Sequence, residues 1–229
     1  MKGSEFEPEL INPIKVKQMS EMYIRNHGGD VPDNIPPLAS FYSRYRQQVI
    51  ERALVMNALL NIYFKAPTTV IHDWLGQHNL LEALTEDELG LLHKKNSELS
   101  EKELTNLYWY IESLWALFWV MNLHDDLAID AHVPDYMIKL VPDLRKNEGP
   151  EKFSNVEMRT DKQIYEMLDL YYRLHWFTSY CKTENIDCSP IGHDFVFERR
   201  KALFWVMHPE QEWHNVDMRF FYRQTEESQ

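Results

Sequence analysis

Apolar residues recur at steps of three and four along most of the chain, which is the spacing of the buried face of an α-helix. The longest such pattern covers residues 40–64 and places one apolar stripe on Val49, Ala53, Met56 and Leu60. No stretch alternates between apolar and polar residues for long enough to require a β-strand. The pattern therefore predicts an all-α protein.

Helix start and stop signals divide the rest of the chain into further helices. Capping boxes at residues 85–88 and 100–103 begin helices that extend to about residues 94 and 122, and Pro67 begins another helix in its first turn. The remaining expected elements are helices over 12–27, 160–182 and 191–207, and an irregular connection over 123–159 with at most one short helix near 135–140.

The segment over about 104–121 is apolar almost all round, which is typical of a helix at the centre of a domain. A chain of 229 residues is long enough for one well-buried core. Residues 3–6 read Gly-Ser-Glu-Phe, as translated cloning sites do, so we exclude residues 1–6 as a scar. We therefore expect a single compact multi-helix domain over residues 7–229.

The chain is acidic, with a formal net charge of −12. An acidic surface repels nucleic acid and anionic membranes and attracts basic proteins, so neither nucleic acid nor a membrane is an expected partner. The longest apolar run, residues 114–123, is too short to span a bilayer. No signal sequence precedes the two cysteines, Cys181 and Cys188, so we expect a cytoplasmic protein with free thiols. A local bridge between the two cysteines is the less favoured alternative.

Several charged residues lie inside the apolar helical pattern, where a charge is costly unless it is paired. Glu112 is an example, because its neighbours at three- and four-residue steps are aromatic or small and apolar. The candidate polar core consists of Glu51, Arg52, Glu112, Arg173, His175, Glu198 and Arg199.

Two interpretations of this polar core are open. In the first, which we favour, the glutamates pair with Arg52, Arg173 and Arg199 in a buried ionic network that fixes how four helices meet. In the second, the same residues line a pocket, in which His175 acts as an acid or base and the arginines hold an anionic ligand.

Motifs for metal or nucleophilic chemistry are weak. The triplet at residues 124–126 (His-Asp-Asp) has ligand side chains, but consecutive residues at a helix end point in different directions. His208, Glu210, Glu212 and His214 form a second His/acid cluster without HExxH or CxxC spacing. The sequence holds no Gly-rich phosphate loop and no recognisable Ser or Cys nucleophile motif. We therefore expect no metal, no cofactor and no catalytic residue.

The order of these segments resembles domain-of-unknown-function family 4272, a group of mostly bacterial proteins without an established activity. The resemblance spans about residues 14–217, and the segments that carry it are 36–37, 51–54, 112–119, 172–176 and 198–205. It implies an α-helical domain with a core that contains Glu, Arg and His. The chain departs from the family where members end with Trp-Asp-Asp and a later Asp-Thr, because Trp213 is followed here by His214 and Asn215.

Three functional hypotheses follow. We favour a non-enzymatic, acidic interaction protein, such as an immunity protein that binds and neutralises a basic toxin or effector domain. The alternatives are an enzyme or small-ligand binder that uses the polar core as a pocket, and a purely structural domain. For the interaction protein, the candidate partner-binding acids are Glu82, Glu86, Asp87, Glu88, Asp125, Asp126 and Asp130, with Trp74 or Tyr136 as an apolar anchor.

Overall fold

The structure is a computed structural model that describes residues 10–39 and 42–220, so the expected scar at residues 1–6 lies outside the described residues. None of the described residues lies in a β-strand, which confirms the all-α prediction. The α-helices are α1 (Pro13–Asn26), α2 (Arg46–Tyr63), α3 (Thr68–Gln77), α4 (Glu86–Leu92), α5 (Glu101–Val120), α6 (Asp161–Glu184) and α7 (His193–Met207). Short 3-10 helices are η1 (Leu81–Ala83), η2 (Asn96–Glu98), η3 (Asp135–Lys139), η4 (Leu144–Lys146), η5 (Pro150–Phe153) and η6 (Trp213–Asn215).

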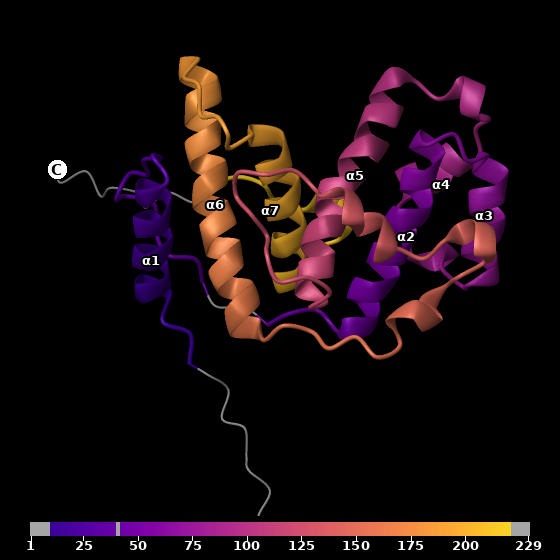
Figure 1. The fold of residues 1–229 in the computed structure, drawn as a ribbon, viewed down its shortest axis with the longest axis horizontal. Coiled ribbons are helices and arrows are strands. Elements are labelled where there is room, and N and C mark those ends of the chain that lie inside the picture. Colours follow the sequence, from indigo (N-terminus) through magenta and orange to yellow (C-terminus); the bar gives the residue numbers. More distant parts are fainter. Residues whose placement is uncertain (1–9, 40–41, 221–229) are drawn as a thin grey trace, which may run out of the picture.

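The helices form a row in which sequence order and spatial order differ. From one end to the other, the row runs α1, α6, α7, α5 and α2, with α3 and α4 beyond α2 (Figure 1). Helix α7 packs against both α6 and α5, and α5 packs in turn against α2. The connection between α5 and α6 holds three of the short 3-10 helices, where the sequence predicted at most one short helix.

The core is densest where α5 crosses α2 and α7. Every residue of α5 from Glu112 onward is buried, as is Met121 directly after it, in agreement with the predicted central helix over 104–121. The half of α5 before Glu112 is more open, because Thr105, Asn106 and Tyr108 are exposed. On α2 every residue over 52–60 is also buried, so two helices share the central position.

Side-chain caps position the helices that matter for the site. Thr85 and Ser100 each accept a hydrogen bond from the backbone N–H of the third residue of the following helix, which is a glutamate. The carboxylate of that glutamate accepts a hydrogen bond from the backbone N–H of the capping residue, as the sequence predicts. The predicted start of the second helix at residue 40 is wrong, because α2 begins only at Arg46. Arg44, which precedes α2, is bonded to the end of α7 instead. Its backbone N–H donates to the Val206 carbonyl at 2.8 Å, and its Nε donates to the Trp205 carbonyl at 2.7 Å.

The end of α6 carries the disulfide that the sequence reading disfavoured. Asn185 ends α6 in the left-handed conformation, with φ of 54°, and turns the chain back on itself. The turn brings the Cα atoms of Cys181 and Cys188 to 6.3 Å, within the normal range for a disulfide, and the structure joins them. The prediction of free thiols is therefore wrong. Among the described helices, none combines the length and the apolar character needed to cross a bilayer.

Candidate functional site

Three buried clusters account for most of the predicted polar core. In the first, Arg199 on α7 donates to the Glu112 carboxylate on α5 through Nε at 2.8 Å and Nη2 at 2.6 Å. The same guanidinium donates to the Tyr171 hydroxyl and to the carbonyls of Ala128 and Ala131. Both ions are almost completely buried, and every donor direction of the guanidinium is used. This cluster links α7 to α5, to α6 and to the loop that follows α5.

In the second cluster, Arg173 on α6 pairs with an acid four residues earlier on the same helix. Its Nε and Nη2 donate to the two oxygens of Asp169 at 2.9 and 3.0 Å. Its remaining donors reach Glu21 on α1 at 3.2 Å and the Pro36 carbonyl at 3.1 Å. Arg173 and Asp169 are both fully buried, so this cluster fastens α1 and the following loop onto α6.

In the third cluster, His175 on α6 contacts Arg200 on α7 through its Nδ1. Burial and the neighbouring Arg200 charge lower the pKa of His175 to about 3, so its imidazole is neutral at pH 7. Arg200 also donates to the carbonyls of Met218 and Arg219, and it lies over the ring of Phe220. The neutral ring of His175 therefore accepts a hydrogen bond from Arg200 and has a structural role. It is unsuited to act as an acid or base near neutral pH.

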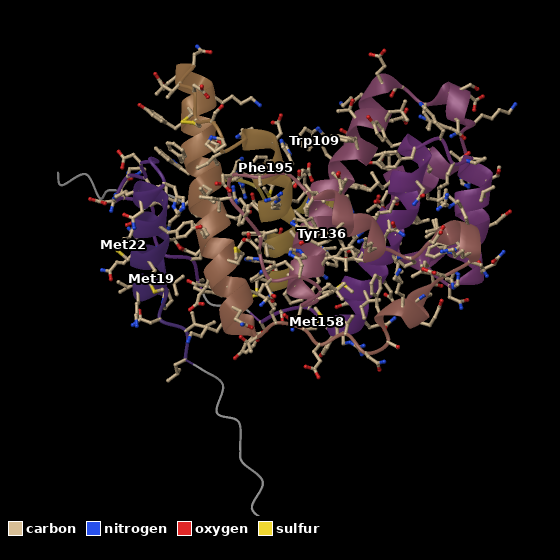
Figure 2. The ribbon with its side chains drawn as sticks, viewed as in Figure 1. Met19, Met22, Trp109, Tyr136, Met158 and Phe195 are labelled. Atoms are coloured by element: carbon tan, nitrogen blue, oxygen red, sulfur yellow. A yellow bond between two sulfur atoms is a disulfide. The ribbon has the colours of Figure 1, made fainter. Side chains whose placement is uncertain are left out.

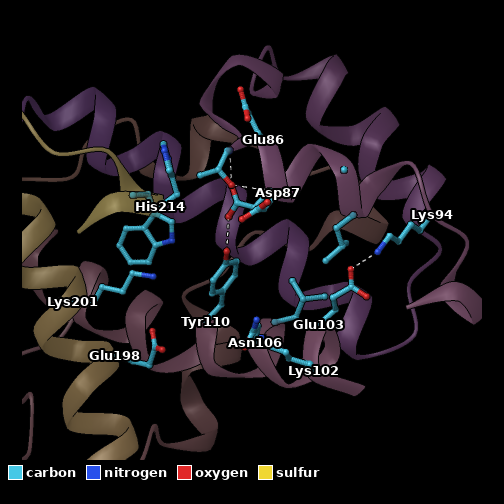
Figure 3. A pocket seen from close by; sticks show the side chains of 16 residues that line it. Glu86, Asp87, Lys94, Lys102, Glu103, Asn106, Tyr110, Glu198, Lys201 and His214 are labelled. Atoms are coloured by element: carbon cyan, nitrogen blue, oxygen red, sulfur yellow. Dashed lines mark hydrogen bonds and ion pairs between the residues drawn. The ribbon is translucent and has the colours of Figure 1, made fainter. Parts of the chain in front are cut away.

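None of these three clusters lines the cleft that lies between α4 and α5 on one side and α7 with η6 on the other. This cleft, called here the main cleft, has a volume of about 660 Å³. Figure 3 shows Glu198 and Lys201 on one side of it and Tyr110 and Asn106 on the opposite side. Of the predicted core residues, Glu198 alone lines the main cleft.

One wall of the main cleft carries Glu88, whose carboxylate is the partner of a buried arginine behind it. Arg52 on α2 donates to both oxygens of Glu88 on α4, at 2.7 and 3.1 Å, and Tyr110 donates to the same carboxylate at 2.6 Å. Burial raises the pKa of Glu88, but Arg52, the Thr85 amide and Tyr110 outweigh it and hold that pKa below its ordinary value. The expectation of an exposed Glu88 is wrong, because this carboxylate is 5% exposed and is the internal partner of Arg52.

The α7 side of the main cleft, called here its floor, carries two charges of opposite sign that form no salt bridge among the described residues. The Glu198 carboxylate accepts a hydrogen bond from Ser113 at 2.8 Å, and burial raises the pKa of Glu198 above its ordinary value. Lys201, one turn further along α7, places its Nζ 4.4 Å from the centre of the Trp213 ring, and burial lowers the pKa of Lys201. Within the described part of the chain, neither group forms a salt bridge. Shifts of this kind in a cleft mark a candidate functional site.

A second, smaller cleft continues the first. It has a volume of about 390 Å³ and shares Thr85, Glu86, Trp213 and His214 with the main cleft, so the two form one groove. Five partly or fully exposed acids border the groove and form no salt bridge among the described residues. These rim acids are Glu51, Glu82, Glu86, Asp87 and Glu212. Glu51 thus belongs to the rim rather than to the predicted buried network.

The other predicted acids lie far from the groove. Asp125, Asp126 and Asp130 are exposed in the loop after α5, and the charges of the last two act on Tyr23 of α1, at the opposite end of the row from α4 (Figure 1). The structure therefore separates the predicted partner-binding acids into one group at the groove and one group near α1.

The two proposed apolar anchors differ in exposure. Trp74 is unsuited to be an anchor, because it is 4% exposed and its Nε1 donates to the Glu148 carbonyl at 3.2 Å. Tyr136 is 47% exposed, lies in front of α5 (Figure 2) and packs edge-on against Trp115. A partner can reach the ring of Tyr136 but not that of Trp74.

The metal-like triplet at residues 124–126 is a structural element. His124 stacks on Trp115 at 3.5 Å and has both ring nitrogens within hydrogen-bond distance of carbonyls, those of Trp115 and Asp126. Across the described residues, no group of three His, Cys, Asp or Glu side chains is arranged to hold a metal ion.

Several important residues escaped the sequence reading. Asp169 lies four residues before Arg173, so the standard helical ion-pair spacing could have found it. Lys201 lies three residues after Glu198 and could have been found in the same way. Tyr110 had no such signal, because its contact with Glu88 joins residues 22 apart in the chain.

Comparison with known families agrees with this architecture. The model of one family, described as Domain of unknown function (DUF4272), matches residues 16–216, which is most of the chain. The chain belongs to this family. No curated protein and no solved structure matches it. Membership in DUF4272 gives no activity, so the function has to be inferred from the groove itself.

Proposed function

We propose that this DUF4272 protein is a non-enzymatic, acidic interaction protein that binds a basic partner protein through the rim of the groove. The observation that carries the proposal is the gathering of the five rim acids around one concave surface, with no ion partner among the described residues. The overall formal charge of −12 adds a long-range field of the same sign.

The bases beside the rim support the same interpretation, because most of them are already occupied. Arg52 pairs with Glu88, Lys94 pairs with Glu103 at 2.5 Å, and Arg44 donates to backbone carbonyls. Lys102 is the exposed base on the groove that has no salt bridge within the described chain. Negative charge therefore dominates what an approaching partner meets, and such a surface accelerates association with basic proteins.

A biological role that fits this surface is that of an immunity protein, which occupies a basic toxin or effector domain and blocks it. Inhibitors of this kind need a preformed acidic surface and no chemistry of their own. The support here is the unpaired rim, and the role predicts that a gene for a basic, toxin-like protein lies beside the gene for this chain. A neighbourhood of metabolic genes would speak against it.

Binding of a basic probe tests the location of the surface. The rim variant Glu82→Gln/Glu86→Gln/Asp87→Asn and the control variant Asp125→Asn/Asp126→Asn/Asp130→Asn each move the formal charge from −12 by three units to −9. The probe is a capped, fluorescent decapeptide of alternating Lys and Ala, followed by anisotropy at low and at physiological salt.

The rim variant should weaken binding at low salt by roughly 1–2 kcal/mol, or about 5–30-fold, since each exposed pair contributes a few tenths to one kcal/mol. The control variant should bind almost as wild type does. Equal losses in both variants would show that net charge alone governs binding, and the rim would lose its assigned role.

The competing hypothesis of an enzymatic polar core receives little support from the geometry. Glu112, Arg173, His175 and Arg199 are each at most 5% exposed and are bonded to internal partners. They hold helices together, as the first interpretation of the sequence predicts, and Glu198 is the member of the set that faces the main cleft.

A further inference from the structure

The floor of the main cleft differs from its rim, because it presents one acid and one base instead of a surplus of acids. Glu198 and Lys201, the floor pair, lie one turn apart on the same face of α7 and both line the cleft (Figure 3). Each is largely removed from water, and neither has an ion partner in the described part of the chain. The two charges act on each other through space without forming a salt bridge, so each is only partly compensated, and burial of such charges costs stability.

The charges across the cleft act on Lys201 in opposite directions, because Arg52 lowers its pKa and Glu88 raises it. Arg52 and Glu88, which are both buried, pair through two hydrogen bonds, and the Glu88 carboxylate accepts a third from Tyr110. The floor as a whole is therefore balanced in charge. An entering cation would be opposed by Lys201, and an entering anion would be opposed by Glu198, so a ligand with both charges fits best.

We propose that the floor of the main cleft binds a small zwitterion of the α-amino-acid class, with its ammonium group on Glu198 and its carboxylate on Lys201. The cleft volume of about 660 Å³ is in the usual range for a small-molecule site. The Glu198 carboxylate is a hydrogen-bond acceptor, which suits the N–H donors of a primary ammonium group. A quaternary ammonium group needs an aromatic cage instead, and Trp213, which lies against Lys201, is only 4% exposed.

This site is independent of partner binding at the rim. The rim acids are exposed and act on a macromolecule at long range, whereas the floor pair acts on a small molecule through direct contact. Loss of one function therefore leaves the other intact.

Isothermal titration calorimetry of the full chain at pH 7.5 tests the site, with the twenty free amino acids as probes and glycine betaine as a zwitterion without N–H donors. The two floor variants are Glu198→Gln and Lys201→Met. Their matched controls are Glu101→Gln and Lys102→Met, which remove the same charges from exposed positions at the start of α5. Circular dichroism and thermal melting establish that each variant is folded.

At least one amino acid should bind the wild-type chain, and glycine betaine should not. Each floor variant should weaken that binding by about tenfold or more, while both controls and the rim variant bind as wild type does. The proposal is overturned if no amino acid binds at concentrations up to about 10 mM, a very weak limit. It is also overturned if folded Glu198→Gln and Lys201→Met variants keep the wild-type affinity.

Discussion

Replacing Arg173 by Met should destabilise the protein by roughly 3–5 kcal/mol, because it leaves buried carboxylates without a counterion. Asp169 is the main source of the cost, since its side chain is fully buried and accepts both of its charge-assisted hydrogen bonds from Arg173. The cost at Glu21 is smaller, because the Lys17 ammonium remains 3.5 Å from its carboxylate. A loss of this size is a large part of the roughly 5–15 kcal/mol that stabilises a typical domain.

Urea unfolding at pH 7 measures the effect, with Arg145→Met as the control. Arg145 also pairs with an aspartate, but it is exposed, so its loss should cost about 1 kcal/mol or less. The double variant Arg173→Met/Asp169→Leu should recover much of the lost stability and give a coupling energy of roughly 1–3 kcal/mol. An Arg173→Met variant within about 1 kcal/mol of wild type would refute the reasoning, because it would mean that water already solvates Asp169.

Three further predictions concern stability. Trp115→Ala should cost about 3–5 kcal/mol in urea unfolding, because it empties a buried site and removes the stack on His124; a loss below about 1 kcal/mol would contradict its central position. Glu198→Gln should raise the free energy of unfolding at pH 8, because burial raises the pKa of Glu198 in the folded state and its charged form is therefore unfavourable there. This gain should shrink as pH falls and disappear below pH 4.5, the ordinary pKa of the side chain; a gain that stays constant with pH would contradict this prediction. His175 has a lowered folded pKa, so it favours folding above pH 6.5 and progressively less toward pH 3. His175→Gln should therefore flatten the acid side of the stability curve, and an unchanged slope would argue against a buried neutral imidazole.

The helices could be predicted from the sequence because local signals determine them. The capping boxes at Thr85 and Ser100 and the apolar spacing of residues 104–121 act within one or two turns, and the structure has helices at each of these places. The start of α2 was predicted too early, because contacts of Arg44 with the end of α7, more than 160 residues away, decide it. The cysteine pairing was missed for a related reason, since it depends on the left-handed turn at Asn185.

The candidate site was only partly predictable. Burial of charged residues followed from the apolar pattern around them, and the Glu112–Arg199 pair was among the pairings expected. Other partners were assigned wrongly or missed, because a side chain two helices away in the chain can be nearer in space than a neighbour in sequence. Glu88 shows this well, since its position in the first turn of α4 is typical of an exposed acid and only the packing of α2 makes it the partner of Arg52.

Site-specific photo-crosslinking in the native organism tests the proposed acidic interaction surface most directly. p-Benzoylphenylalanine replaces Glu86 on the rim of the groove in one strain and Asp130, in the loop near α1, in the other. Mass spectrometry then identifies the crosslinked proteins. The account predicts a basic protein that is captured from position 86 and not from position 130, and whose yield falls with added salt. The same captured proteins from both positions, or no basic protein from position 86, would contradict it.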